Sequence, residues 1–394
     1  MTTRRLLVAV PDRVSDWVAK GEVVERYFNP GSRFDHVDLL LTNDDRPPGD
    51  ALRVMAGPAS ITVHNVPAPT WLFAATLGWR PSLLRPWVDR AVRVVRAADP
   101  SLIRCHGARL NALVAARARA QLGIPYVVSL HSNPDTDQLR AARSGPVRRV
   151  AGRLVESVER AGLLDADLVL PVYEPIVPYL RRIGVTRFEV AYNVIGGGVR
   201  PKRSWDRVEP GVLRAVCVGR QERGEKDPSP IIEAIAELPA VQLHLIGSGP
   251  LHDDLRRLAI TLGVADRVTF TPVLRNDGVL EALAAADVFV YRSELYEVSK
   301  GCIEAALTGL PIVTSDRDGA PAPELVGEHV VLVDGSRSSY REALGRLHRD
   351  DALRGRVGRA ALAFAQQRWD PARAEARVAG IYDALLAAGR PATT

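Results

Sequence analysis

Cysteine is scarce in this sequence, and long hydrophobic runs are missing. The three cysteines, Cys105, Cys217 and Cys302, are far apart, with no CxxC pair and no metal-ligand spacing. We expect them to be small core residues of a protein from a reducing compartment. No apolar run reaches the roughly 18 residues of a membrane-spanning helix, and Leu6 to Val10 is too short for a signal peptide. The expected location is therefore cytoplasmic.

Lysine is also scarce, although the chain is basic overall. Lysine and arginine number 52 against 46 acidic residues, and the pI is near 9.4. The basic residues are scattered among acids, and aromatic residues do not interleave with them, so nucleic-acid binding is not expected. The four lysines are Lys20, Lys202, Lys226 and Lys300. A lysine in such an arginine-rich chain indicates a place where a compact ammonium fits better than a guanidinium fork.

Strand-like and helix-like segments alternate along the chain, which predicts an α/β fold with parallel sheets. With 394 residues, the chain is long enough for two domains. A stretch rich in Gly, Pro and charge at 196–211 is typical of a linker. We therefore expect domains at 1–205 and 206–370, a helix within 20–29, and a strand at 189–194.

The segment 287–314 carries most of the functional information. Val288 to Tyr291 predicts a buried strand, and after a polar loop a helical pattern runs to Gly309. In a parallel sheet, this arrangement places the loop and the helix N-terminus at the carboxyl edge, where an anion is favoured. Lys300 and Glu304 share one face of that helix, and Glu297 precedes it. A lysine between two carboxylates suits a ligand with both phosphates and hydroxyls, such as a nucleotide sugar.

These residues resemble the retaining family 4 nucleotide-sugar glycosyltransferases. Their motif is Glu-x₇-Glu followed by Ala, an apolar stretch, Gly and Pro, and the segment from Glu304 through Gly309 to Pro311 matches its second half. The first half departs from the motif: eight residues before Glu304 stands Tyr296, and the nearest carboxylate, Glu297, leaves six residues between. We interpret this as a loop shorter by one residue.

The resemblance implies a fold of GT-B type. Two Rossmann-like parallel-sheet domains would face each other across a cleft, with an acceptor-side domain at 1–205 and a nucleotide-sugar-binding domain at 206–370. A C-terminal helix at 371–390 would cross back to the first domain.

A second cation pair follows the first strand of the second domain. Gly219-Arg220 ends that strand, and Lys226 comes six residues later, just ahead of a helix. Two cations at a phosphate-binding edge favour an anion. Relatives use this Gly-Arg and Lys to hold the donor diphosphate, so the resemblance assigns Arg220 and Lys226 to donor binding, together with Lys300.

The remaining roles also follow from the resemblance. Glu304 would hold the ribose hydroxyls, Glu297 the hydroxyls of the sugar, and Gly21 in the first loop would approach the donor phosphates. His131 follows a strand and would contact the transferred sugar, so His131 and Glu297 are the predicted catalytic residues. His106, also at a strand end, is expected to be structural.

The function implied is a hexosyltransferase that transfers a sugar with retention from a UDP or GDP sugar to a small polar acceptor, such as one used in natural-product biosynthesis. No cofactor and no metal ion are expected. Asp165 with Asp167, and Asp316 with Asp318, have the spacing of a divalent-ion site but do not adjoin the predicted site.

Three alternatives stay open from the sequence. An arginine-rich amphipathic helix at 139–162 suits a membrane-surface enzyme with a lipid acceptor, although a solvated face explains it as well and membrane contact is not favoured. The shortened loop before Glu304 permits a non-catalytic nucleotide-sugar-binding relative. An epimerase or phosphorylase of the same fold is the third.

The Gly247-x-Gly249 pair lacks the third glycine of a dinucleotide site.

Overall fold

The chain forms two compact units, each built around one sheet. The computed structural model describes residues 3–68, 80–136, 146–196, 198–224, 226–295, 297–316 and 322–388. Unit 1 comprises Met1–Ala19, Val23–Val194 and Ala372–Thr394, and unit 2 comprises Lys20–Glu22 and Ile195–Pro371. Three residues of the first loop thus group with unit 2.

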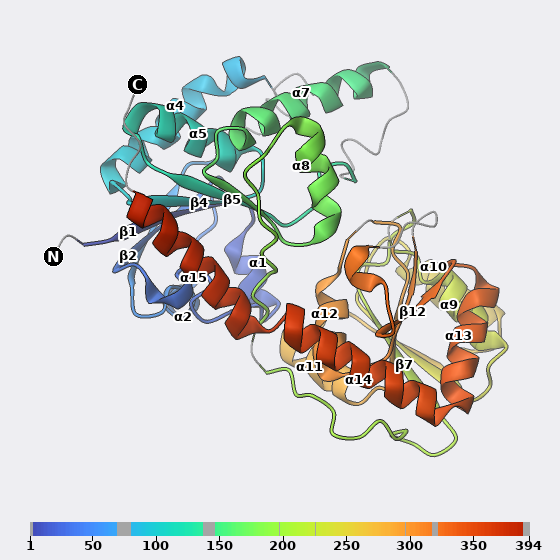
Figure 1. Cartoon of the computed structure of the whole chain (residues 1–394). Helices are drawn as coiled ribbons and strands as arrows, with labels where there is room; N and C mark the ends of the chain where they lie inside the picture. Colours follow the sequence, from blue (N-terminus) through green and yellow to red (C-terminus); the bar gives the residue numbers. More distant parts are fainter. Residues whose placement is uncertain are drawn as a thin grey trace. The chain divides into compact units, whose positions relative to one another are not determined.

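Unit 1 holds a parallel sheet with helices around it (Figure 1). Its strands are β1 (Arg5–Val10), β2 (His36–Leu41), β3 (Ser60–Asn65), β4 (Leu102–His106), β5 (Tyr126–Leu130) and β6 (Leu168–Pro171). Its helices are α1 (Val14–Ala19), α2 (Gly49–Ala56), α4 (Pro81–Ala98), α5 (Leu110–Leu122), α7 (Pro146–Leu163), α8 (Val177–Ile183) and α15 (Pro371–Ala388), with 3-10 turns η1 (Pro30–Ser32) and η2 (Glu174–Ile176).

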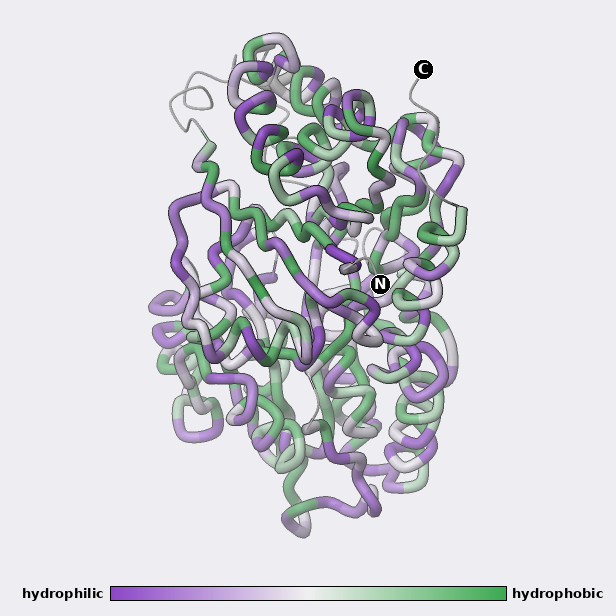
Figure 2. The backbone as a smooth tube through the Cα atoms, turned by 90° about the vertical axis from the view of Figure 1, so that its left-hand side faces the viewer, coloured by the Kyte–Doolittle hydropathy of each residue, from purple (hydrophilic) through white to green (hydrophobic). Residues whose placement is uncertain are grey.

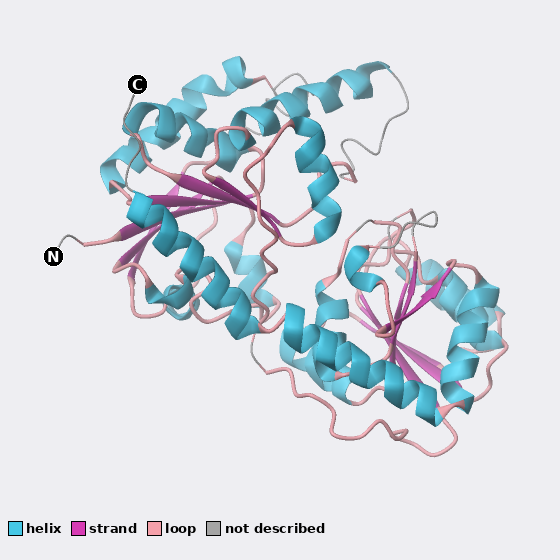
Figure 3. Cartoon of the chain, viewed as in Figure 1, coloured by secondary structure: helices cyan, strands magenta, loops and turns pink. Residues whose placement is uncertain are grey.

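Unit 2 repeats the same plan. Its strands are β7 (Leu213–Val218), β8 (Val241–Ile246), β9 (Val268–Thr271), β10 (Val288–Tyr291), β11 (Ile312–Ser315) and β12 (Val330–Val333). Its helices are α9 (Ser229–Ala236), α10 (His252–Thr261), α11 (Asn276–Ala284), α12 (Lys300–Thr308), α13 (Arg337–Arg349) and α14 (Asp351–Arg368), with the 3-10 turn η3 (Pro323–Leu325). Figure 3 shows each sheet in magenta among cyan helices.

Both sheets have the strand order of a doubly wound Rossmann fold. The orders are β3-β2-β1-β4-β5-β6 and β12-β11-β10-β7-β8-β9, and the pairings are parallel. The order reverses direction between β1 and β4 in unit 1, and between β7 and β10 in unit 2. This strand order confirms the predicted fold class of two Rossmann-like domains. Ligands of such sheets bind beyond the carboxyl ends of the strands at the switch point.

The hydrophobic pattern explains why these segments form these elements. The inner strands are buried on both faces, and β1, for example, is almost wholly buried from Leu6 to Val10. Helices such as α4 bury one face, and along the tube of Figure 2 the helical turns change between green and purple. Gly123 and Gly309 end α5 and α12 in the left-handed conformation that glycine adopts without strain.

The C-terminal helix α15 packs on unit 1, as the fold prediction requires. Glu375 in α15 accepts a hydrogen bond from the Gly31 backbone N–H at 2.9 Å and pairs with Arg26 at 2.8 Å. Tyr382 is fully buried, and its ring packs edge-on against Phe34 at 5.8 Å. These contacts join the end of the chain to residues more than 340 positions away.

Two local predictions were wrong. The first helix is α1, at Val14–Ala19, and residues 20–29 form turns in which Gly21 and Arg26 have positive φ. The segment 189–194 is no regular strand, although the backbone N–H groups of Glu189 and Ala191 bond β6. Of the arginine-rich helix, Arg140 and Arg143 lie outside the described residues. Across the ranges that are described, no helix has both the length and the apolar character needed to cross a bilayer.

Candidate functional site

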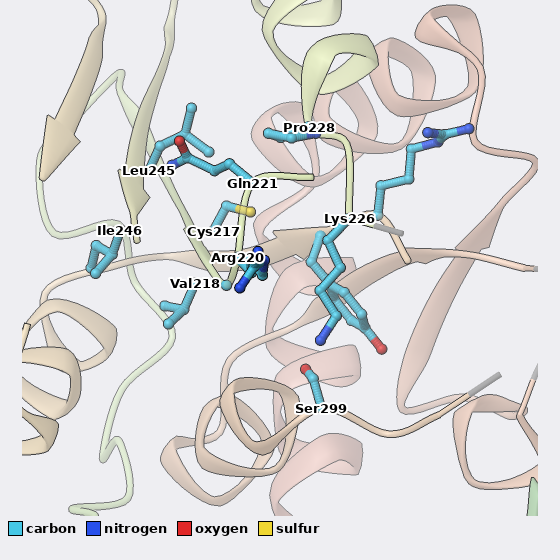
Figure 4. Close-up of a pocket in the computed structure, with 12 residues that line it drawn as sticks. Cys217, Val218, Arg220, Gln221, Lys226, Pro228, Leu245, Ile246 and Ser299 are labelled. Atoms are coloured by element: carbon cyan, nitrogen blue, oxygen red, sulfur yellow. The ribbon is translucent and has the colours of Figure 1, made fainter. Parts of the chain in front are cut away.

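A hollow of about 370 Å³ lies at the carboxyl ends of β7, β8 and β10, close to the switch point of unit 2. Arg220, Lys226, Tyr291 and Ser299 are among its lining residues. Figure 4 shows the Lys226 side chain extending toward Ser299. We call this the unit 2 hollow.

A tight turn brings the two predicted cations of the hollow together. Glu222 and Lys226 exchange both backbone hydrogen bonds, at 3.2 and 2.9 Å, across a turn in which Gly224 has a φ of +75°. Such a φ favours glycine. The turn is anchored by Gln221, which is buried, donates to the Gly247 carbonyl oxygen at 3.2 Å and bonds His252 at 2.8 Å.

Both cations have carboxylate partners in this structure. The Lys226 Nζ lies 2.6 Å from the Glu297 Oε1, and both side chains are about three-quarters buried. The Arg220 guanidinium pairs with Glu222 and is 64% exposed. The structure thus brings Lys226 and Glu297 together, and it leaves the Arg220 side chain far more accessible to water than that of Lys226.

The N-terminus of α12 also borders the unit 2 hollow. Ser299 caps the helix, because its Oγ accepts a hydrogen bond from the Cys302 backbone N–H at 3.2 Å. A Cβ on Gly301 would lie 3.4 Å from the Cβ of Val218, so the first turn packs closely on the end of β7. The remaining first-turn amides have no partner within the helix. With the helix dipole, they favour a negative charge.

Lys300 does not line the unit 2 hollow. Its Nζ donates to Glu22 Oε1 at 3.0 Å and to Asn276 Oδ1, and it lies 3.5 Å from Glu304 Oε1. Lys300 is therefore surrounded by three oxygen-bearing side chains from three separate segments of unit 2. Its charge is balanced locally, which differs from the expectation of a lysine directed at phosphate.

Glu304 is a buried carboxylate with an unused acceptor. Its side chain is 3% exposed, and its Oε1, although 3.5 Å from the Lys300 ammonium, receives no hydrogen bond from the described residues. Burial raises the pKa of this carboxyl above its usual value, against the opposing effect of the Lys300 ammonium. A buried acceptor of this kind suits a hydroxyl donor from a ligand.

Gly21 lies beside the same network. Its φ is +71°, and a Cβ at this position would lie 3.2 Å from the Asn276 backbone nitrogen, which itself donates to the Lys20 carbonyl oxygen at 2.9 Å. The first loop is thus held against the start of α11, within the same unit as Arg220, Lys226, Lys300 and Glu304.

The Gly247-x-Gly249 pair serves packing. A Cβ on Gly247 would lie 2.1 Å from the Gly219 carbonyl oxygen, and one on Gly249 would lie 2.2 Å from that of Gln221. The loop after β8 therefore supports the backbone that carries Arg220. This close approach explains the two glycines without a dinucleotide.

Replacement of Gly247 by alanine should destabilise unit 2 by about 2–3 kcal/mol, because the methyl group meets backbone at a φ of +132°. Gly263→Ala is the matched control. It also has positive φ, at +68°, but open space around it, so about 1 kcal/mol is expected. Urea unfolding of both variants measures the difference, and equal destabilisation would contradict the packing role.

His131 lies in unit 1, just beyond the carboxyl end of β5. Its ring stacks on that of His106, with centroids 4.8 Å apart and an interplanar angle of 15°. Burial and then the nearby Arg104 lower the pKa of His131 to about 3, opposed by a hydrogen bond with Asn193. The imidazole is therefore neutral at physiological pH. His106 is also buried beside it.

The other chemical candidates are structural where the structure describes them. Asp167 pairs with Arg119 and accepts from the Tyr126 backbone N–H at 2.9 Å. Asp318 and Tyr296 lie outside the described residues. In the described ranges, no group of three or more His, Cys, Asp or Glu is placed to hold a metal ion. Burial raises the pKa of Cys217 to about 12, so this residue of the hollow stays a thiol.

Three residues of the site were missed from the sequence. Ser299 had a local signal, since a serine just before a helical pattern predicts an N-cap. Glu22 and Asn276 had none, because they reach Lys300 from 278 and 24 positions away.

Together, the fold and this site define a class: a pair of Rossmann-like units of GT-B type with a hollow lined by cations at the switch point of the second. Residues 29–194 match the glycosyl transferase 4-like domain, and residues 213–350 match the glycosyl transferases group 1 domain. The chain belongs to the family of glycosyltransferases that carry these two domains.

Curated relatives match over part of their length. Lipopolysaccharide core biosynthesis glycosyltransferase LpsE of Rhizobium meliloti is 35% identical over 128 residues, which cover 32% of this chain and 37% of LpsE. D-inositol 3-phosphate glycosyltransferase of Streptomyces avermitilis is 26% identical over 302 residues, covering 69% of this chain and 63% of the relative. The chain therefore spans between about a third and two thirds of these relatives.

Solved structures share the fold over nearly the whole chain. Anabaena HepE, crystallised with UDP and glucose, superposes with a TM-score of 0.69 over 97% of this chain and 100% of that one, at 18% identity. Sucrose-phosphate synthase from Thermosynechococcus elongatus superposes with a TM-score of 0.68 over 98% of this chain and 100% of that one, at 19% identity.

Proposed function

We propose that this protein transfers a sugar, with retention of anomeric configuration, from a nucleoside diphosphate sugar to a small polar acceptor. The observation that carries the proposal is the unit 2 hollow. Lys226 and Arg220 border it beside the capped N-terminus of α12, at the switch point of a Rossmann-like sheet. Phosphates bind at such a place in this type of sheet.

The diphosphate would replace the carboxylate partners of these cations. Lys226 is held by Glu297, and Arg220 by Glu222, so a bound pyrophosphate would exchange one anionic partner of each cation for another. Glu297, released from Lys226, would then face the hydroxyls of the sugar. The ion pair thus keeps both residues in place before the donor arrives.

Glu304 would accept hydrogen bonds from the ribose hydroxyls. Its Oε1 has no hydrogen bond from the described residues, and burial strengthens any bond made there. Lys300 would orient Glu304 and Glu22, since its ammonium contacts both. Gly21, held against α11, would leave space for the phosphates near this network.

The reaction needs charge stabilisation on the departing diphosphate. Cations and helix amides arranged in advance provide it, at about 1.5–3 kcal/mol for each charge-assisted hydrogen bond. In the retaining mechanism, the acceptor attacks from the side of the leaving group, and a diphosphate oxygen takes the proton of the acceptor hydroxyl. His131, neutral in the folded protein, would hydrogen-bond the sugar.

The donor and acceptor classes rest on different support. HepE was crystallised with UDP, which favours a uridine nucleotide as donor. The relatives are named for lipopolysaccharide core synthesis and for transfer to D-inositol 3-phosphate. The second name favours the small polar acceptor proposed here, whereas the first fits the alternative of a lipid-linked acceptor.

The expected result is hydrolysis and transfer with one nucleotide sugar only. Thermal unfolding with UDP, GDP and ADP identifies the base, because a ligand that binds the folded state raises the Tm. Release of free monosaccharide from the matching donor then measures slow hydrolysis, and EDTA should leave the rate unchanged. A protein that binds the nucleotide but never cleaves any donor would be a non-catalytic relative, and the proposal would be wrong.

A further inference from the structure

A second hollow, of about 330 Å³, lies within unit 1. Arg104, Ser129 and Asn193 contribute polar groups to its lining, while Leu170 and Val378 contribute apolar surface. It is bounded by β4, β5, β6 and α15. We call it the unit 1 hollow, and the donor site in unit 2 does not use it.

Arg104 carries a buried charge into this hollow. It is 6% exposed, and it donates to the Ser129 Oγ at 3.4 Å and to the Tyr27 carbonyl oxygen at 3.2 Å. Its guanidinium carbon also lies 5.7 Å from the centroid of the Tyr27 ring. All of these partners are neutral. Within the described ranges, no carboxylate lies within 4 Å of Arg104.

Another buried arginine of the chain has a carboxylate partner, which is the usual arrangement. Arg354 is 1% exposed, and its Nη1 lies 2.8 Å from the Asp351 carboxylate. A buried charge without such a partner costs several kcal/mol. Arg104 therefore stands where an arginine is unfavourable for stability unless an anion joins it.

Two histidines add further unsatisfied groups beside Arg104. The Nε2 atoms of His106 and His131 are buried and have no hydrogen-bond partner among the described residues. The positive charge of Arg104 helps to lower the pKa of both histidines, and Asn193, which lines the hollow, hydrogen-bonds His131. Buried polar groups of this kind are nearly always paired. Of these three groups Arg104 itself lines the hollow, so an anion bound there would contact its guanidinium.

We propose that the unit 1 hollow binds an anionic group, phosphate or carboxylate, with Arg104 as its counter-ion and Ser129 and Asn193 as neighbouring polar groups. Assigning that anion to the acceptor rests on the proposed function, and the acceptor class then narrows to small anionic polyols or sugars. The anion site itself stands on the contacts of Arg104 alone.

The direct test measures thermal unfolding in inorganic phosphate, in acetate and in sodium chloride at equal ionic strength. The parent protein is the Arg220→Ala, Lys226→Ala double variant, so that phosphate does not report on unit 2. We expect one of the two anions to raise the Tm by a few degrees over chloride, and which of them does so distinguishes a phosphate from a carboxylate site. The absence of a shift with both anions would overturn the proposal.

Arg104→Met, added to that parent, should abolish the shift. Arg96→Met is the matched control, because Arg96 is exposed on α4 and bonds only the Gln121 side chain in the described structure. The control should keep the full shift. In chloride alone, Arg104→Met should have an equal or higher Tm, since it removes an unpaired buried charge. A large loss of Tm there would assign Arg104 a structural role and overturn the proposal.

A second measurement uses the unmodified protein and its donor. Glycerol 3-phosphate and an inositol phosphate should exceed glycerol and inositol in kcat/KM by about tenfold to a hundredfold, the effect of one charge-assisted pair. Equal rates for the charged and neutral acceptors, with donor hydrolysis present, would contradict this inference alone. Loss of all donor hydrolysis, with the anion-dependent Tm shift intact, would contradict only the proposed function.

Discussion

Replacement of Lys226 by alanine should lower kcat/KM for the nucleotide-sugar donor by about a hundredfold to a thousandfold. That is the usual effect of removing one charge-stabilising donor from a site where negative charge develops. Lys226 is three-quarters buried at 2.6 Å from Glu297, so its interactions are weakly screened. Its removal also leaves Glu297 without its cation.

Arg220→Ala should have a smaller effect, about tenfold. The Arg220 side chain is 64% exposed and pairs with Glu222, so water screens the charge that it presents. The two variants thus separate a buried from an exposed phosphate contact. Steady-state kinetics with titration of the free nucleoside diphosphate measure both effects.

Arg223→Ala is the matched control for these variants. Arg223 lies in the same turn, is exposed and carries the same charge as Arg220. Its removal changes the net charge equally but should leave kcat/KM within about twofold, since exposed charges contribute little. If all three variants bound the nucleotide as tightly as the wild type does, the donor site would not lie at this edge of the sheet.

Glu304→Gln should weaken donor use and strengthen the fold at the same time. A neutral amide accepts weaker hydrogen bonds from ribose hydroxyls than a carboxylate does, so kcat/KM should fall by about tenfold to a hundredfold. The fold should gain on the order of 1 kcal/mol at pH 8, because a charge is removed from a residue that is only 2% exposed. Lys300 keeps Glu22 as its partner at 3.0 Å.

The stability gained by Glu304→Gln depends on pH, and its direction follows from the raised pKa of Glu304. Burial raises the pKa of the Glu304 carboxyl in the folded state, so its contribution to stability is fully present below the unfolded pKa of about 4.3. That contribution is lost as the pH rises through the higher, folded-state value. Wild type and Glu304→Gln should therefore unfold at the same temperature near pH 4 and diverge toward pH 8.

Donor affinity should show the opposite trend in the wild type. Acidification through the raised pKa protonates Glu304 and weakens donor binding, whereas Glu304→Gln should show no such pH dependence. Glu281→Gln, on an exposed position of α11, is the control for loss of one negative charge. A Glu304→Gln variant that is less stable than wild type at pH 8 would show that Glu304 is structural.

Much of the fold could be read from the sequence because its determinants are local. β10, for example, is a short apolar run whose four residues are all buried, and that burial leaves a continuous pattern. The helix predicted within 20–29 was wrong because the determinants of this segment are not local. Its turns and its attachment to unit 2 depend on contacts with α11, which no local pattern records.

The sequence by itself determined the candidates for the chemistry of the site: Arg220 and Lys226 stand six positions apart after a strand, Glu304 stands in the second half of a motif, and Glu297 stands one position off its first half. Only the tertiary structure decided their partners. It joined Lys226 to Glu297, gave Lys300 to Glu22 across 278 positions, and left Arg104 without a carboxylate among the described residues. Motif residues occupy one turn or one helix, where spacing sets geometry. Charge partners meet through the packing of distant strands and helices, and their identity is decided only when the sheet has formed.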